Sequence, residues 1–442
     1  MDITDFLNNE YSDSALYMNY RSLPSYIDGL KNSGRKIVYT IKKKNIKSRM
    51  KVSSHGSEVV NTSGYLHGEG SIQGAIVTRA ADYCGANNLP ILKAEGSFGT
   101  RFTPDAAAPR YIFTRPNDDF DLVFPKADDV NLTCQEFEGD EIEPLFYVPT
   151  VPLLLINGCS GIGVGFANSV LNRSTANMIA ALRAKLAGKK VKKDLFIPSW
   201  HGFRGTVKEI EDNKFEIRGL VDIDNKKVQI SEIPMCYSLL SYLNLLKSLK
   251  DRSVITKFID FSEDDNFSFE VTLSDDEAMK SKDAIMNDLG LIQIETENPT
   301  CVDENNAIRE FKDAAEIFDA YYDIKIKYLE KRIKSETIRL SDEETLLRET
   351  AKFIKEVIKG TINLKLKRAD VESLMKTKGY VNIDTLIGMP LYSITADKAA
   401  EIEKRWKDKL AELNAFKLET PVTIWTKDLD NLEKELKKEG TL

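Results

Sequence analysis

Apolar residues in the first third of the chain recur at helical spacing between turn signals. Residues 10–50 have the pattern of helices, and residues 71–81 show a second helical pattern. A glycine-rich turn at 95–101 precedes the strand-like run Arg110–Thr114. Short helices followed by a turn and a strand predict a winged helix-turn-helix.

The pattern changes in residues of about 140–300, where β-rich runs alternate with amphipathic helices. The predicted strands are 203–210, 215–217, 227–233 and 267–273, and the predicted helices are 238–249 and 276–289. This alternation of short strands and helices indicates an α+β domain.

The last third has the pattern of two long helices. Residues from about Ala307 to Gly360 contain no internal Pro or Gly, and apolar residues recur every seven positions in a coiled-coil seam: Ile333, Leu340, Leu347 and Ile354. A return helix starts near Thr395, which is suited to be its N-cap. We therefore expect a compact globule at about 360–394, held between antiparallel helices as a dimer contact.

Together these patterns predict an α+β multidomain protein. We expect a winged helix-turn-helix domain at 1–125, an α/β domain at 126–305, and an antiparallel coiled coil with a dimerisation globule at 306–442.

Composition narrows the class of protein. Apolar residues make up 42% and charged residues 30%, as in soluble globular proteins. We find no apolar run long enough to span a membrane and no signal-peptide core at the N-terminus. The five cysteines are scattered without a Cys-x-x-Cys pair. We therefore expect neither zinc nor disulfides, and a reducing, cytoplasmic location.

Positive charge is concentrated near the N-terminus, although the net charge is -7. Residues 31–51 contain nine Lys or Arg and no Asp or Glu: Lys31, Arg35, Lys36, Lys42, Lys43, Lys44, Lys47, Arg49 and Lys51. Such a run is either a solvated helix face or a phosphate-binding surface, because cations at phosphates release counterions.

Arg110 directly precedes Tyr111 after the glycine-rich turn. A tyrosine can attack a phosphodiester and store the bond as phosphotyrosine. Its phenol has a pKa of about 10, so attack at neutral pH needs nearby positive charge or a base. An adjacent arginine supplies that charge and can donate two hydrogen bonds to phosphate oxygens at once. The alternative is an ordinary half-buried aromatic at a strand end.

Short motifs occur in a fixed order from about residue 12 to the end: Arg21-Ser22-Leu23-Pro24, Asp28-Gly29-Leu30-Lys31, Tyr65-Leu66-His67-Gly68-Glu69, Gly85-Ala86-Asn87-Asn88, Gly96-Ser97-Phe98-Gly99-Thr100-Arg101, Ala107-Ala108-Pro109-Arg110-Tyr111, Tyr147-Val148-Pro149, the run 156–165, Phe203-Arg204-Gly205-Thr206 and the run 389–395. With this ordered set, the chain resembles the breakage-reunion subunit of type IIA DNA topoisomerases. The likeness is closest to the medium subunit of T4-type phage DNA topoisomerase II, together with the C-terminal half of eukaryotic topoisomerase II. The corresponding subunit of DNA gyrase is more distant.

The resemblance implies roles for individual residues. Tyr111 would link to a 5′ phosphate, Arg110 would stabilise the transition state, and Ile162 would wedge between base steps and bend the duplex. Four residues match positions that crowd the scissile phosphate: Arg21, Arg35, Lys36 and His67. Further DNA contacts are expected from the basic run: Lys31, Lys42, Lys43 and Lys44. The domains at 1–125 and 126–305 would be the DNA-cleavage and tower domains.

The resemblance also implies partners and cofactors. The chain contains no Walker A motif and no Toprim metal-binding motif. ATP and Mg²⁺ would therefore be bound by a large ATPase/Toprim subunit, and no metal site is expected here. Two copies would bind double-stranded DNA and dimerise through the coiled-coil gate, with no membrane partner. For a phage protein, the location would be the cytoplasm of a bacterial host.

Departures from the family pattern carry their own expectations. His67 stands alone where relatives often have two histidines, because Tyr65 and Leu66 precede it. Gly70 and Gly74 replace the serine and the acidic residue that bridge quinolones in bacterial enzymes, so we expect poor quinolone sensitivity. We identify no long basic wrapping domain, which favours relaxation and decatenation over supercoiling.

Two other classes of protein remain open from the residues. One is a non-catalytic winged-helix dimer that shapes DNA, for which Tyr111 would be dispensable. The other is a tyrosine recombinase, which would carry a dispersed Arg, His-x-x-Arg and Tyr set with the tyrosine near the C-terminus; Tyr111 lies near the N-terminus.

Overall fold

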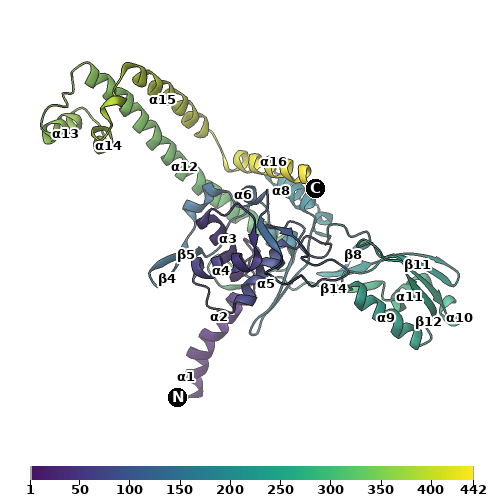
Figure 1. Ribbon diagram of the computed structural model, residues 1–442. Coiled ribbons are helices and arrows are strands. Elements are labelled where there is room, and N and C mark those ends of the chain that lie inside the picture. The colour runs from purple at the N-terminus through teal and green to yellow at the C-terminus, as the bar shows by residue number, and fades with distance from the viewer. Residues whose placement is uncertain (1, 442) are drawn as a thin grey trace. The chain divides into compact units, whose positions relative to one another are not determined.

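The computed structural model describes residues 2–441 and divides the chain into two compact units (Figure 1). The first unit contains the residues up to Lys325 together with those from Thr426 onward, and the second contains Ile326–Trp425. Helices and small antiparallel sheets confirm the predicted α+β class. The division into three domains stays a prediction.

The N-terminal part of the first unit is a helical cluster with a small sheet. Its helices are α1 (Ile3–Phe6), η1 (Leu7–Tyr11), α2 (Ser12–Ser22), α3 (Asn32–Lys44), α4 (Val52–Ser63) and α5 (Glu69–Ala80). The strands β1 (Met50–Lys51), β2 (Leu92–Glu95) and β3 (Phe113–Pro116) form an antiparallel sheet in the order β1-β3-β2. Helix α2 ends where Leu23 takes the extended conformation that a following proline favours.

The connecting elements complete this cluster. They are α6 (Phe120–Val123), η2 (Lys126–Asn131), β4 (Cys134–Phe137), β5 (Asp140–Pro144), α7 (Leu153–Asn157), β6 (Cys159–Ile162), β7 (Ala167–Val170), α8 (Thr175–Leu186) and η3 (Lys193–Phe196). The C-terminal helix α16 (Pro421–Glu439) contributes residues that bind Arg183 of α8, whose guanidinium lies 2.7 Å from both Asp430 and Glu433.

Two sheets and three helices form what we call the tower. Its elements are β8 (Thr206–Glu211), β9 (Lys214–Arg218), β10 (Leu220–Asp224), β11 (Lys227–Glu232), α9 (Leu239–Asp251), β12 (Ile255–Asp260), β13 (Phe269–Leu273), α10 (Asp275–Ala278), α11 (Lys282–Asp288) and β14 (Ile292–Thr296). The strand orders are β10-β11-β13-β12 and β14-β9-β8. Alternate residues of β11 and β13 pack against α9 and α11 in one apolar core. Figure 1 shows these helices beside the strands.

A short hairpin and a long helix follow the tower. The hairpin pairs β15 (Thr300–Val302) with β16 (Ile308–Glu310), and α12 (Ala314–Ile358) begins after it. Within the first unit, Tyr321 of α12 donates a hydrogen bond of 2.7 Å to the Pro149 carbonyl. This side chain is fully buried, as expected for a packing residue.

The second unit pairs the distal part of α12 with α15 (Ala396–Phe416). The Trp406 indole donates to Glu344 at 2.7 Å, and Lys355 bonds Glu403 at 2.6 Å. The predicted Thr395 N-cap is confirmed, because its hydroxyl accepts a hydrogen bond from the Lys398 amide. The globule between the helices contains α13 (Arg368–Thr377), α14 (Ile383–Ile387) and η4 (Leu391–Ser393) around its own apolar core.

Three predicted elements were wrong in their bounds. Arg110–Thr114 is not one strand, because residues 109–111 form a turn and β3 starts at Phe113. The helix predicted at 276–289 is two, because the Ser281 hydroxyl caps a new helix by accepting from Ala284. The long helix starts at Ala314, since residues from Ala307 lead into β16. No helix among residues 2–441 combines the length and apolar character that a membrane crossing requires.

His55 of α4 gives the fold a testable pH dependence. It is fully buried, and neither ring nitrogen has a hydrogen-bond partner within the described part of the chain. Burial lowers the pKa of His55 to about 4 from 6.5. The unfolded chain therefore binds this proton more tightly, so stability is full above pH 6.5 and falls as the pH drops toward 4. We expect a loss of up to about 3 kcal/mol from this group, measured by urea unfolding at stepped pH.

The control is His55→Leu, which fills much of the same space without a titrating group. Its unfolding free energy should depend less steeply on pH between 6.5 and 4. Identical slopes in the two proteins would show that His55 does not carry this dependence.

Candidate active site and DNA-binding surface

Tyr111 lies on a turn that covers the N-terminus of α4. The amides of Val52 and Ser53 donate to the carbonyls of Ile112 and Pro109, at 3.1 and 3.2 Å. The first amides of a helix have no partner inside it, so these two bonds fix the turn to α4. The Tyr111 amide closes the turn on the Ala108 carbonyl at 2.9 Å. The backbone of the tyrosine is therefore held firmly.

The ring of Tyr111 is free although its backbone is held. The residue is 70% exposed, which rules out the half-buried packing role. Arg110 lies beside it, with its guanidinium carbon 5.4 Å from the ring centroid. Arg110 is exposed and forms no ion pair among residues 2–441. The pair thus presents an exposed phenol and an unpaired cation next to each other on the turn.

His67 is part of a second group, next to α2. Its Nε2 lies 2.6 Å from the Tyr17 hydroxyl, and the Tyr65 ring meets the imidazole edge-on at 5.3 Å. Partial burial, followed by the positive charges of Arg21 and Lys36, lowers the pKa of His67 below its ordinary value. The imidazole is therefore neutral near pH 7, and Nε2 can accept a hydrogen bond from the Tyr17 hydroxyl.

Ile162 lies at the end of a hairpin formed by β6 and β7, and it is 84% exposed. The side chain of Asn19 in α2 bonds both backbone groups of Val164 in this hairpin. It accepts from the Val164 amide at 2.6 Å and donates to the Val164 carbonyl at 3.1 Å. Gly163 allows this approach, because an added Cβ would lie 2.1 Å from the Asn19 side-chain oxygen. The exposed isoleucine is thus mounted on a braced hairpin.

A cavity of about 580 Å³ lies between α5 and this hairpin. Lys31 and Arg79 both line it, and Lys31 donates to the Ser160 carbonyl at 2.8 Å. The sequence did not single out Arg79, because a single arginine in a helical pattern gives no signal. Only its placement beside Lys31 suggests that it belongs to the DNA-binding surface.

Arg35 was predicted to contact phosphate, and its side chain is buried in an ion pair with Asp28. Its guanidinium has no exposed surface and bonds Asp28 at 2.9 Å, the Leu30 carbonyl at 2.8 Å and the Tyr20 hydroxyl at 3.1 Å. A side chain without exposed surface cannot reach a phosphate in this conformation.

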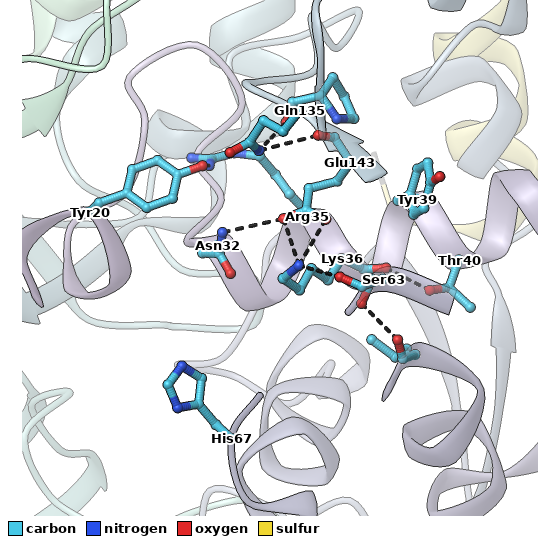
Figure 2. A network of polar contacts seen from close by, with 12 residues as sticks. Tyr20, Asn32, Arg35, Lys36, Tyr39, Thr40, Ser63, His67, Gln135 and Glu143 are labelled. Carbon is cyan, nitrogen blue, oxygen red and sulfur yellow. Dashed lines mark hydrogen bonds and ion pairs between the residues drawn. The ribbon is translucent and has the colours of Figure 1, made fainter. Parts of the chain in front are cut away.

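Lys36 is buried as well. Figure 2 shows its side chain beside those of Glu143 and Ser63. Its Nζ donates to Glu143 at 2.9 Å and to the Ser63 carbonyl at 2.5 Å, whereas the ring of His67 stands apart from these bonds. Glu143, on β5, is buried too and neutralises the lysine. This ion pair separates Lys36 from the exposed cations, and its contact with phosphate stays a prediction.

The other predicted cations differ in how far they are free. Lys42 bonds Asp129 at 2.7 Å, and Lys43 donates to the Tyr39 hydroxyl at 2.7 Å. Lys44 is exposed and, like Arg21, has no ion pair in the described chain. Some cations of the basic run therefore bond other parts of the protein, and only the others form an exposed charged surface.

The acidic, histidine and cysteine side chains are dispersed. Among residues 2–441, no group of three or more His, Cys, Asp or Glu side chains is arranged to hold a metal ion. The described side chains therefore do not form a complete Mg²⁺ site by themselves.

The fold matches that of topoisomerase II cleavage domains. The crystal structure of the Plasmodium falciparum topoisomerase II DNA-binding, cleavage and re-ligation domain aligns with a TM-score of 0.88 and 26% identity, over 98% of this chain and 64% of that chain. Residues 21–430 match the model of the DNA gyrase/topoisomerase IV A-subunit family. The chain belongs to this family.

The curated relatives are larger proteins. Mitochondrial DNA topoisomerase 2 of Dictyostelium discoideum is 30% identical over 454 residues, which cover 98% of this chain and 35% of the relative. DNA topoisomerase 2 of Arabidopsis thaliana is 29% identical, with 98% and 33% covered. The chain spans about a third of the length of these relatives. The closer likeness to T4-type phage proteins stays a prediction.

Proposed function

We propose that this chain cleaves and rejoins duplex DNA through Tyr111, as the breakage-reunion part of an ATP-dependent type II DNA topoisomerase. The observation that carries this proposal is the placement of Tyr111: its backbone is fixed to α4, its ring is exposed, and Arg110 lies beside it. Membership of the gyrase and topoisomerase IV family supports the same activity.

The chemistry is a transesterification. The Tyr111 oxygen forms a bond to phosphorus as its proton leaves, and the bond from phosphorus to the 3′ oxygen breaks, so that this oxygen leaves and takes up a proton. The strand is then joined to Tyr111 through its 5′ phosphate. Arg110 stabilises the charge on the phosphate oxygens during the transfer. Religation is the reverse reaction and needs no ATP, because the bond energy is kept.

The remaining predicted residues divide into two groups. We propose that Arg21, Lys31, Lys44 and His67 contact the DNA backbone, with Lys42 and Lys43 at the edge of this surface. Arg35 and Lys36 act instead as braces beneath it, because their charges are neutralised by Asp28 and Glu143. Arg79 joins the DNA-binding group through its shared cavity with Lys31.

Mg²⁺ and ATP belong to a partner in this proposal. The described residues of this chain offer no metal-binding group, so no step above runs through a metal that it holds. We propose that a large ATPase/Toprim subunit binds both, and that the assembly relaxes and decatenates DNA in the cytoplasm, for a phage protein that of its bacterial host.

Two copies are proposed to meet through the globule of the second unit. Its surface exposes large apolar residues, with Val381 77% and Tyr392 84% exposed. Exposed apolar side chains of this size on a small globule are typical of an interface.

The activity is tested with supercoiled plasmid, the chain, its ATPase/Toprim partner, Mg²⁺ and ATP. After rapid denaturation, we expect protein covalently joined to 5′ ends of cleaved DNA, and relaxed plasmid in the undenatured sample. Absence of both would reject the enzyme and favour a winged-helix dimer that only binds and shapes DNA.

Ile162→Ala is expected to reduce DNA bending. Inserting an apolar side chain between base steps unstacks them and kinks the duplex, and alanine is too short to hold the steps apart. We expect the bent population to fall about tenfold, equal to about 1.4 kcal/mol. The measurement is energy transfer between dyes at the two ends of a short duplex.

Met279→Ala is the matched control, because Met279 is also exposed and apolar but lies in the tower helix region. It should leave bending unchanged. Equal bending by the Ile162 variant and the unaltered protein would mean that Ile162 is no wedge.

A further inference from the structure

The segment between β2 and β3, residues 96–112, joins the tyrosine turn to the tower; we call it the wing. Its tip is a tight turn in which the Thr100 amide donates to the Thr103 carbonyl at 2.8 Å. The Thr100 hydroxyl accepts from the amides of Phe102 and Thr103, at 3.1 and 3.2 Å. Gly99 allows the chain before the tip to approach the chain after it, since an added Cβ would lie 2.4 Å from the Pro104 carbonyl oxygen. The turn therefore presents Arg101 and Phe102 outward as a rigid pair.

Arg101 inserts into the tower. Only 6% of its side chain is exposed, and its guanidinium bonds Glu232 at 2.5 Å and the Ile233 carbonyl at 2.5 Å. Glu232 ends β11, is 2% exposed, and also accepts from the Arg204 amide at 3.2 Å. The guanidinium further lies over the Phe267 ring at 4.7 Å. A buried ion pair with these extra bonds fixes geometry, because either charge left alone would be costly.

Phe102 adds an apolar anchor next to the ion pair. Its ring centroid lies 5.0 Å from that of Phe267, and it packs against the tower core. The tip of the wing is thus held by charge and by apolar packing at once.

The other end of the wing carries Tyr111. The chain before the tip and the chain after it meet at the base of the wing, where the Ala107 amide donates to the Ser97 carbonyl at 2.9 Å. An added Cβ on Gly96 would lie 3.1 Å from Ile112, directly after the tyrosine. The two stretches of chain on either side of the tip are short and hydrogen-bonded to each other. A shift of the tip therefore moves the base.

We propose that Arg101 and Glu232 are positioning residues for Tyr111, which transmit the position of the tower to the tyrosine turn through the wing. This rests on the proposed cleavage activity of Tyr111. The pair does not touch the scissile phosphate; it fixes the turn that presents the nucleophile, so its loss slows attack without weakening DNA binding. Misplacement by about 1 Å can cost about 10²-fold in rate.

The test compares two buried pairs in the same unit. Arg101→Met breaks the wing pair, whereas Arg173→Met breaks the pair of Arg173 with Glu297, which is equally buried and bonds at 2.9 and 2.6 Å. Both variants are studied as the full chain with its ATPase/Toprim partner, below the unfolding temperature of the less stable one. The rate of covalent Tyr111–DNA formation and the affinity for a labelled duplex are measured. Arg101→Lys, which restores the charge, is the conservative variant.

We expect Arg101→Met to form the covalent complex about 10²-fold more slowly at unchanged duplex affinity, with partial rescue by Arg101→Lys. Arg173→Met should lose stability but keep the rate. Equal rates for the two methionine variants would overturn the proposal. A second readout needs no cleavage: hydrogen exchange of the amides in 96–112, without DNA, should rise only in Arg101→Met. If the unaltered protein forms no covalent complex, the cleavage proposal fails, and unchanged exchange in Arg101→Met would still reject the wing anchor.

Discussion

Tyr111→Phe is expected to abolish cleavage and relaxation while leaving DNA binding intact. The substitution removes only the hydroxyl oxygen that attacks phosphorus, and no other group on the turn can form the same bond. The ring is 70% exposed, so the fold does not depend on this hydroxyl. We expect relaxation of supercoiled plasmid to fall at least about 10⁴-fold, to the background of the assay, and no covalent complex after denaturation.

Tyr11→Phe is the matched control, since Tyr11 of η1 is also exposed, at 47%, and belongs neither to the proposed site nor to the proposed interface. It should relax plasmid at the rate of the unaltered protein. Affinity for a labelled duplex should be the same in all three proteins. Full activity in Tyr111→Phe would remove the enzyme proposal and leave a protein that shapes DNA; lost affinity would show that the hydroxyl serves binding.

The elements that the sequence predicted well are those whose signals are local. The cap at Thr395 and the apolar spacing of α3 depend on neighbouring residues, and both appear in the structure. Two of the three errors in element bounds arose at Ser281, where a cap begins a new helix, and at Tyr111, where the turn is bonded to α4. The bonds of the turn come from α4, which is distant in the sequence, whereas the Ser281 cap is a local signal that the prediction of a single helix overlooked.

The residues of the candidate site could likewise be predicted only in part from the sequence. Residue type marked Tyr111, Arg110 and Ile162, because their chemistry or family position is distinctive. Charge alone could not separate Lys44 from Arg35 on the same helix, since burial depends on acidic partners elsewhere. Glu143, which neutralises Lys36, is more than a hundred positions away. Arg101 ends the motif Gly96–Arg101, but its partner Glu232 lies in the tower, so only the fold shows the ion pair that it forms.

Arg35→Met is expected to destabilise the protein by about 3–5 kcal/mol, a large share of the roughly 5–15 kcal/mol that holds a typical domain. The substitution leaves Asp28 buried without its cation. Asp28 would keep only the amides of Leu30 and Tyr147, at 2.9 and 3.0 Å. Urea unfolding monitored by circular dichroism measures the loss, and it should appear without DNA.

Lys44→Met is the matched control, because it also replaces a cation of α3 by methionine but does so at an exposed position. It should alter the unfolding free energy by less than about 0.5 kcal/mol. It should instead weaken duplex binding and lower the slope of log affinity against log salt by about 1. If Arg35→Met kept its stability and lost salt-dependent affinity as Lys44→Met does, Arg35 would be a phosphate contact and the buried pair with Asp28 would not describe the working protein. The opposite responses of the two variants would establish that the basic segment holds the DNA-binding surface with some of its charges and binds DNA with others.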